Sequence, residues 1–219
     1  MKMQIKFVIN QIRRFLIPYL VIFLLCLLIK LFFSRDTIFF TVNSFHWALT
    51  DRIAPFLTDL GEGYTTVIIA TFWALFNYRK AFLLATSWGV TSLLAQILKP
   101  IFHAPRPAVY FHDQLNRIHF VPGVAILSLN SFPSGHTVTA FSTAVVFTYL
   151  SKNKSPGPLF LLLAMLIGFS RMYLSEHFFE DVMTGSVLGV FITVFWLAWL
   201  DGTKFIHTEG WNRGLLKKI

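Results

Sequence analysis

Residues 15–33 read FLIPYLVIFLLCLLIKLFF, a run whose only charged side chain is Lys30. As a helix, this run is about as long as the roughly 30 Å hydrocarbon core of a bilayer is thick. It is long for the apolar core of a secretory signal, and the Ser34-Arg35-Asp36 sequence behind it offers no small-residue cleavage site. We therefore expect the run to remain in the protein as a first membrane span.

The composition of the whole chain points to the same class of protein. The 219 residues are 55% hydrophobic and 13% charged, a balance that leaves too little polar surface for an ordinary soluble domain. Five further apolar segments follow the first, so we predict an all-α fold, a single integral-membrane domain over residues 1–219 built as a bundle of six transmembrane helices. The predicted spans are residues 15–33, 64–76, 81–98, 137–150, 159–169 and 182–200.

The positive charge of the chain is distributed as a topology signal. The formal net charge is +9, but the basic residues stand in short clusters between apolar spans and not along one helix face, so nucleic acid is not indicated. With a cytoplasmic N-terminus, the inner segments carry most of this charge, as the positive-inside rule requires, and both termini are cytoplasmic. The inner Lys and Arg residues are Lys2, Lys6, Arg13, Arg14, Arg79, Lys80, Lys152, Lys154, Lys204, Arg213, Lys217 and Lys218.

Two features outside the spans are informative. Cys26 is the only cysteine, which excludes an intramolecular disulfide and indicates no metal–thiolate site. The first outer loop, residues 34–63, carries apolar residues at nearly helical spacing, which predicts a helical segment lying in the membrane interface. A loop packed on the bundle is the alternative. These apolar residues are Ile38, Val42, Phe45, Leu49, Ile53, Phe56 and Leu60.

Unusual polar residues are concentrated in three blocks on the predicted outer face: KPIFHAPRP at 99–107, PSGH at 133–136 and SRMYLSEHFFED at 170–181. A Lys or Arg costs roughly 2.5–3.5 kcal/mol at mid-bilayer, so cations at the ends of three spans should gather at one wet pocket. Lys99, Arg106 and Arg171 together indicate a dianion. Phosphate suits three cations and two guanidinium forks better than a carboxylate does.

The same blocks supply groups for phosphoryl transfer. The backbone N–H groups and hydroxyl around Ser134 precede an apolar helix and can face an anion, and Gly135 lets the backbone approach it closely. His177 and Asp181 are four residues apart, so a carboxylate can hold one ring nitrogen as N–H and leave the other as a nucleophile. His136 is then the candidate acid for the leaving alkoxide, and the base for water in a second step.

Together the blocks resemble the signature motifs of the type 2 phosphatidic acid phosphatase superfamily, K-x6-R-P, P-S-G-H and S-R-x5-H-x3-D, without a departure. The resemblance implies a metal-independent membrane lipid phosphatase without cofactor, with a phosphohistidine intermediate. The small size and bare architecture of the chain favour a bacterial plasma (inner) membrane, with a eukaryotic endomembrane as the open alternative, and the positive-inside distribution predicts that the site lies on the periplasmic (extracytoplasmic) face. The implied catalytic residues are His177, His136 and Asp181, and the implied phosphate-binding residues are Lys99, Arg106, Ser134, Gly135 and Arg171.

Several alternatives stay open. Taken singly, the three blocks could be a snorkelling lysine, a helix cap and a surface His–Asp pair. A lipid-to-lipid phosphotransferase, a phosphate-binding protein without catalysis and a vanadium haloperoxidase would each use the same cradle, although the haloperoxidases are soluble. The substrate is open among phosphatidic acid, phosphatidylglycerol phosphate, undecaprenyl diphosphate and a lipid A phosphate, and the oligomeric state is undetermined.

The long outer loop holds histidines that could be considered as metal ligands and aromatic residues that could contact lipid. Three histidines there do not have the spacing of a compact zinc site, and we interpret them as solvated or as facing lipid headgroups. Three aromatic residues of the same loop are interpreted as interfacial anchors, with contact to an acyl or prenyl chain as the alternative. These residues are His103, His112 and His119, and Tyr110, Phe111 and Phe120.

Overall fold

The computed structural model describes residues 2–216, and the regular structure of this part of the chain is helical. The all-α prediction is thus confirmed. The α-helices are α1 (Lys2–Phe32), α2 (Arg35–Ser44), α3 (Ala48–Leu60), α4 (Gly63–Ala74), α5 (Tyr78–Phe102), α6 (Pro107–Tyr110), α7 (Gly135–Leu150), α8 (Gly157–Tyr173) and α9 (Phe179–Asp201). Short 3-10 helices are η1 (His112–Arg117), η2 (Phe205–His207) and η3 (Glu209–Asn212).

Every predicted span falls on a helix of the bundle: α1, α4, α5, α7, α8 or α9. Helices α1, α5 and α9 are long and apolar enough to cross a membrane, while α4 and α8 are shorter apolar helices. The helices mostly extend beyond the predicted limits, because polar residues at their ends continue the backbone hydrogen bonding that hydropathy does not report. Helix α1 differs most, since it begins at Lys2 and buries Val8 and Ile12 ahead of the apolar run.

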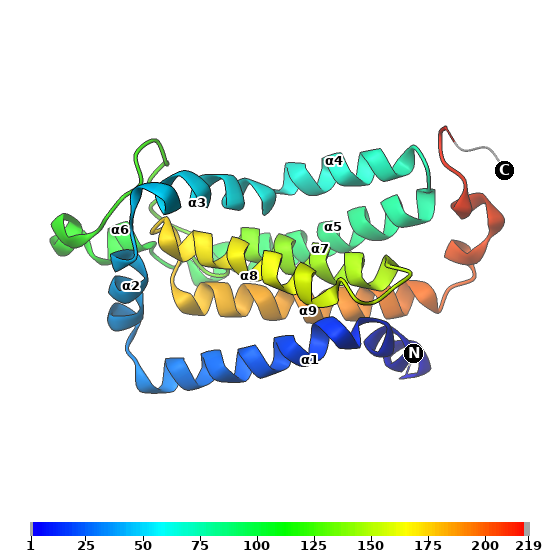
Figure 1. Cartoon of the computed structure of the whole chain (residues 1–219), viewed down its shortest axis with the longest axis horizontal. Coiled ribbons are helices and arrows are strands. Elements are labelled where there is room, and N and C mark those ends of the chain that lie inside the picture. The colour runs from blue at the N-terminus through cyan, green and yellow to red at the C-terminus, as the bar shows by residue number, and fades with distance from the viewer. Residues whose placement is uncertain (1, 217–219) are drawn as a thin grey trace.

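Helix α7 lies in the middle of the bundle and packs against α5, α8 and α9, with α1 and α4 on opposite outer sides (Figure 1). Two glycines of α9 permit its close approach to α7. A Cβ on Gly185 would lie 2.8 Å from the carbonyl oxygen of Ser134, and one on Gly189 would lie 2.7 Å from that of Val138. Small residues four apart are a common means of close helix packing in membranes. Here they bring the beginnings of α7 and α9 together.

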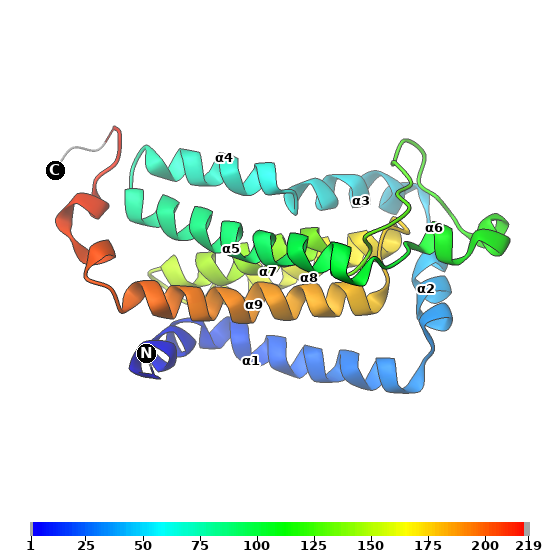
Figure 2. The ribbon, with the colours of Figure 1, turned by 180° about the vertical axis from the view of Figure 1, so that it is seen from behind.

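The first outer loop forms two helices where one interfacial segment was predicted. Helix α2 crosses the end of the bundle, whereas α3 runs along it and continues nearly in line with α4, as both views show (Figures 1 and 2). The two helices separate because α3 has its own start, where the Trp47 N–H donates to Thr50 Oγ1 at 3.1 Å. Helix α3 packs on α8, so the alternative of a segment packed on the bundle describes this half of the loop.

Both ends of the described chain lie at one end of the bundle, and α2, α6 and the long loop before α7 lie at the other (Figure 1). This arrangement agrees with an even number of crossings. The positions of Lys217 and Lys218, which entered the charge argument, lie outside the described residues. The count of six crossings and their orientation stay predictions.

Candidate active site

The first motif block is turned back toward the bundle directly after α5. Helix α5 ends where His103 adopts a left-handed backbone conformation (φ 41°) and its N–H donates to the carbonyl of Lys99 at 2.9 Å. The chain beyond is tied to the segment that leads into α7, because the Arg106 N–H donates to Ser128 and the Ser131 N–H donates to Ala104. These two backbone bonds, of 2.9 and 3.0 Å, place Arg106 beside the start of α7.

The third block is folded around a single carbonyl oxygen. The N–H groups of Glu176 and His177 both donate to the carbonyl of Arg171, at 3.1 and 3.2 Å, and Ser175 takes a left-handed conformation (φ 59°) to close this loop. The Ser134 N–H donates to the carbonyl of Asp181 at 3.1 Å and so joins the second block to the third. All three blocks therefore meet at one end of the bundle.

A cavity of about 370 Å³ lies at this meeting point, between α5, α7 and the junction of α3 with α4. Of the eight residues predicted from the sequence, six line the cavity and two stand behind it. The lining residues are Lys99, Arg106, Gly135, His136, Arg171 and His177, and the two behind are Ser134 and Asp181.

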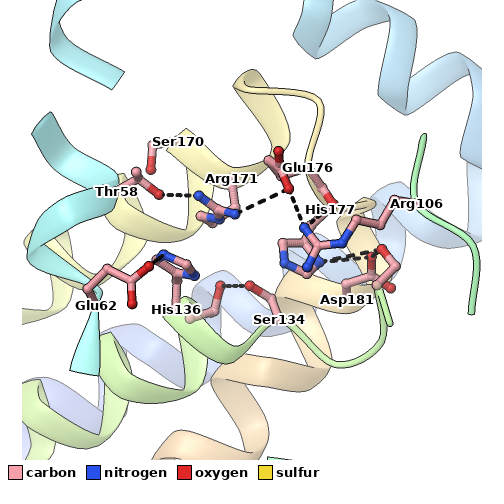
Figure 3. A network of polar contacts seen from close by, with 12 residues as sticks. Thr58, Glu62, Arg106, Ser134, His136, Ser170, Arg171, Glu176, His177 and Asp181 are labelled. Carbon is pink, nitrogen blue, oxygen red and sulfur yellow. Dashed lines mark hydrogen bonds and ion pairs between the residues drawn. The ribbon is translucent and has the colours of Figure 1, made fainter. Parts of the chain in front are cut away.

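His177 is held from behind by Asp181. Its side chain is only 1% exposed, and its Nδ1 lies 3.4 Å from Asp181 Oδ2 (Figure 3). The same carboxylate oxygen accepts hydrogen bonds from the Phe178 N–H at 2.8 Å and from the Ser131 hydroxyl at 2.5 Å. Burial lowers the pKa of His177 to about 4, so the imidazole is neutral near pH 7 and keeps one unprotonated nitrogen.

Two of the three cations are fixed by one buried carboxylate that the sequence analysis did not single out. Arg106 Nη1 donates to Glu176 Oε2, and Arg171 Nη2 lies 3.5 Å from the same oxygen (Figure 3). Arg171 Nη1 also donates to Thr58 Oγ1 at 2.6 Å, which leaves its buried Nε as a donor with no partner among residues 2–216. Such an unsatisfied buried donor requires an explanation, and an anion in the adjoining cavity provides one.

The third cation and the helix start complete the wall. Lys99 Nζ lies 3.6 Å from where a Cβ on Gly135 would stand, so the lysine passes directly over the glycine backbone. Ser134 is fully buried, its hydroxyl accepts from Thr137 Oγ1 at 2.9 Å, and its N–H is already bonded to Asp181. Ser134 thus braces the loop, and Gly135 is the member of this pair that faces the cavity.

The weaker candidates of the outer loop lie apart from the cavity. His112 is 3.2 Å from Asp113 and His119 is 3.1 Å from Asp51. No group of three or more His, Cys, Asp or Glu that could hold a metal ion occurs among the residues that the structure describes. Phe111 is buried against Phe39, which makes it part of a structural aromatic cluster.

The residues that the sequence analysis missed are mostly acids and hydroxyls that serve the motif residues: Thr58, Glu62, Ser131 and Glu176. The only sequence signals for them were local: Glu62 stands between two glycines just before a predicted span, and Glu176 directly precedes His177. Neither signal indicates these contacts, because Arg106 lies 70 residues from Glu176 and His136 lies 74 residues from Glu62, although Arg171, the second partner of Glu176, is only five residues away.

A helical membrane protein in which three cations and two histidines meet at one cavity is typical of a membrane phosphatase. The chain belongs to the PAP2 superfamily, whose model matches residues 80–204 and so includes all three motif blocks. The resemblance to the type 2 phosphatidic acid phosphatases is therefore confirmed, and the protein is a membrane lipid phosphatase, a hydrolase of this family.

Individual relatives agree with this assignment. The chain is 27% identical over 153 residues to undecaprenyl-diphosphatase BcrC of Bacillus subtilis, a match that covers 68% of this chain and 74% of that one. The crystal structure of LpxE from Aquifex aeolicus superposes with a TM-score of 0.64 and 29% identity, covering 72% of this chain and 90% of that one. The transmembrane phosphatidylglycerolphosphate phosphatase of Bacillus subtilis has the same fold, with a TM-score of 0.59, 24% identity and coverage of 84% and 94%.

Proposed function

We propose that this protein hydrolyses a phosphomonoester or diphosphate of a membrane lipid through a phosphohistidine on His177, without a metal ion. The observation that carries the proposal is the shared cavity, in which a neutral, carboxylate-oriented imidazole faces three cations. A protein that only binds phosphate needs the cations but does not need an oriented nucleophile.

In the first half-reaction the free nitrogen of His177 attacks phosphorus, and the bond from phosphorus to the lipid oxygen breaks. His136, on the opposite wall of the cavity, gives its proton to the departing oxygen, so the lipid leaves as an alcohol or as a monophosphate. The Asp181 carboxylate then stabilises the positively charged imidazole that carries the phosphoryl group.

In the second half-reaction His136, now neutral, takes a proton from water while the water oxygen attacks the phosphohistidine. The nitrogen–phosphorus bond breaks, inorganic phosphate is released, and both histidines return to their starting state. Lys99, Arg106 and Arg171 act in both steps on the equatorial oxygens, whose charge is spread in the transition state of phosphoryl transfer. Ser134 and Gly135 are proposed to contribute to phosphate binding through the backbone conformation at the start of α7, and not through their side chains.

The proposed setting is a plasma membrane crossed six times, with the cavity on the extracytoplasmic side. It is supported by the positive-inside distribution of Lys and Arg and by the location of both chain ends opposite the cavity. Reporter fusions after residues 76 and 150 should report the cytoplasm, and a fusion after residue 125 the outside. An active cytoplasmic reporter at residue 125 would invert the orientation.

The substrate class is supported by the relatives, whose names specify different lipid phosphates: undecaprenyl diphosphate for one and phosphatidylglycerol phosphate for another. Purified protein in detergent should release phosphate from at least one of four lipids: undecaprenyl diphosphate, phosphatidylglycerol phosphate, phosphatidic acid and a lipid A phosphate. The released phosphate is measured with malachite green in the presence of EDTA. The His177→Ala variant is the blank. Full loss of turnover in EDTA, or an active His177→Ala variant, would contradict the mechanism.

A lipid-to-lipid phosphotransferase differs only in the acceptor of the phosphohistidine. Radiolabelled phosphate that appears on an added acceptor lipid, with little free phosphate, would favour this alternative over hydrolysis.

A further inference from the structure

Glu62 contacts one of the two cavity histidines from outside the three motif blocks. Its Oε1 lies 2.8 Å from Nε2 of His136, and Figure 3 shows the other ring nitrogen of His136 directed away from Glu62. The Glu62 side chain is 44% exposed and that of His136 is 19% exposed, so the pair stands at the mouth of the cavity, which both residues line.

The fold places Glu62 by breaking the helical line between α3 and α4. Glu62 is the residue before α4, and glycines flank it on both sides. A Cβ on Gly61 would lie 2.5 Å from Ile167 of α8 and 3.3 Å from the Cβ of His136, while one on Gly63 would lie 2.7 Å from the Trp88 ring. Only glycines let this junction approach α5, α7 and α8 closely enough for the carboxylate to reach the imidazole.

The charges around His136 explain why such a carboxylate matters. The groups that face the imidazole from the neighbouring elements are Lys99 of α5, Arg106 of the loop, Arg171 of α8 and His177. Three of them are cations, and each disfavours a proton on His136. Of the other acids nearby, Glu176 binds the two arginines and Asp181 holds His177, while Asp59 of the same junction does not line the cavity. Glu62 is therefore the acid placed to favour the imidazolium.

We propose that Glu62 is a positioning residue that holds His136 by its Nε2–H, so that the other ring nitrogen carries the proton delivered to the leaving lipid oxygen. The inference rests on the proposed function, since it assigns to Glu62 a part in the acid step of that mechanism. No further proton is needed: the one that Glu62 holds stays between Glu62 and His136, and the one on the opposite nitrogen moves to the alkoxide and returns from water.

The test uses the dependence of this step on the leaving group. A lipid alkoxide is a poor leaving group whose departure is strongly accelerated by a proton from a general acid, whereas p-nitrophenolate is a good leaving group and departs without one. Glu62→Gln keeps the size of the side chain and removes its charge. On a lipid phosphomonoester, whose leaving group is an alkoxide, we expect kcat/KM to fall by about 10- to 100-fold, within the range that a general acid contributes, and on p-nitrophenyl phosphate by less than about threefold.

Asp59→Asn is the matched control. Asp59 is an exposed acid of the same junction, and its carboxylate makes no ion pair with the part of the chain that the structure describes. It removes the same charge from the same surface and should change neither substrate by more than about twofold. Equal losses of Glu62→Gln on both substrates, or no loss on the lipid phosphate, would overturn the assignment.

Two further measurements distinguish a positioning role of Glu62 from a structural one. Inhibition by vanadate should stay as strong in Glu62→Gln as in the parent protein, which shows that the cradle is intact; a lost vanadate site would make Glu62 a structural residue and refute the proposal. In a His136→Ala background, Glu62→Gln should add no further loss on the lipid phosphate, because the two residues act as one unit. Additive losses would separate them.

Failure of the Glu62 assignment can be distinguished from failure of the proposed phosphohistidine mechanism. His177→Ala should be inactive on both substrates if the phosphohistidine mechanism holds. If that variant is inactive and Glu62→Gln is unselective, only the role of Glu62 fails; if His177→Ala is active, the mechanism itself fails.

Discussion

Ser131 donates a 2.5 Å hydrogen bond to Oδ2 of Asp181, the same oxygen that lies 3.4 Å from Nδ1 of His177. Its hydroxyl lies farther, at 3.5 Å, from Nδ1 of His177 itself, so the serine acts on the proposed nucleophile mainly through the carboxylate. Together with the Phe178 N–H, which also donates to this oxygen, it fixes the direction in which the carboxylate faces the ring.

Ser131→Ala should lower kcat on a lipid phosphate by about tenfold with little change in KM, because one charge-assisted hydrogen bond on the orienting group is lost. Steady-state kinetics in detergent measure both constants. Ser128→Ala is the control, since Ser128 is exposed and contributes only its backbone carbonyl to the site. A change confined to KM would show that Ser131 serves substrate binding instead.

Glu176→Gln should destabilise the protein, since it leaves Arg106 and Arg171 buried without their shared counter-charge. Removing one partner of a buried ion pair costs about 3–5 kcal/mol as a general magnitude. Added phosphate should restore more stability to this variant than to the parent protein, because the anion then supplies the missing charge. Thermal unfolding in detergent with and without phosphate measures both effects. An equal phosphate effect in the two proteins would contradict the shared-carboxylate arrangement.

Gly189→Ala should lower stability by roughly 1–3 kcal/mol, because its Cβ would meet the Val138 carbonyl at 2.7 Å and force α9 away from α7. Gly89→Ala in α5 is the matched control: nothing lies within 4 Å of the new Cβ, so the substitution should leave stability unchanged or raise it. Thermal unfolding temperatures of the two variants compare them directly. A stable Gly189→Ala variant would show that the helices can separate without cost.

As the pH is lowered, protonation of His177 should reduce kcat/KM only near pH 4, and not near the ordinary histidine pKa of about 6.5. Burial lowers the pKa of His177 to about 4, so the proposed nucleophile stays unprotonated well below pH 6.5. The same shift affects stability: as the pH falls from about 6.5 to 4, the unfolded chain binds a proton at this residue before the folded protein does, so folding stability is lost across this window. Above about pH 6.5 the contribution to stability is fully present.

His177→Asn should therefore lose less stability than the parent protein between pH 7 and pH 5, as measured by unfolding at the two values. Identical pH dependence in the two proteins would show that His177 titrates normally in the folded state.

Much of the fold could be predicted from local sequence. An apolar run as long as residues 15–33 forms a helix in lipid, because its backbone groups must bond within the segment, and each of the six predicted spans falls on a helix. The first outer loop departed from prediction because residues 34–63 carry one continuous helical pattern of apolar residues, and that pattern does not reveal the capping at Trp47 that starts α3 anew.

The sequence by itself determined the class of the bundle and most of the residues that line the candidate site, because hydropathy and motif spacing are properties of neighbouring residues. Only the tertiary structure decided which acids and hydroxyls serve those residues. Glu62 reaches His136 and Glu176 reaches Arg106 because glycine contacts and backbone bonds bring distant segments together. An ion pair depends on a distance in space, and two residues 70 or more positions apart leave no mark of that distance in the linear order of the chain.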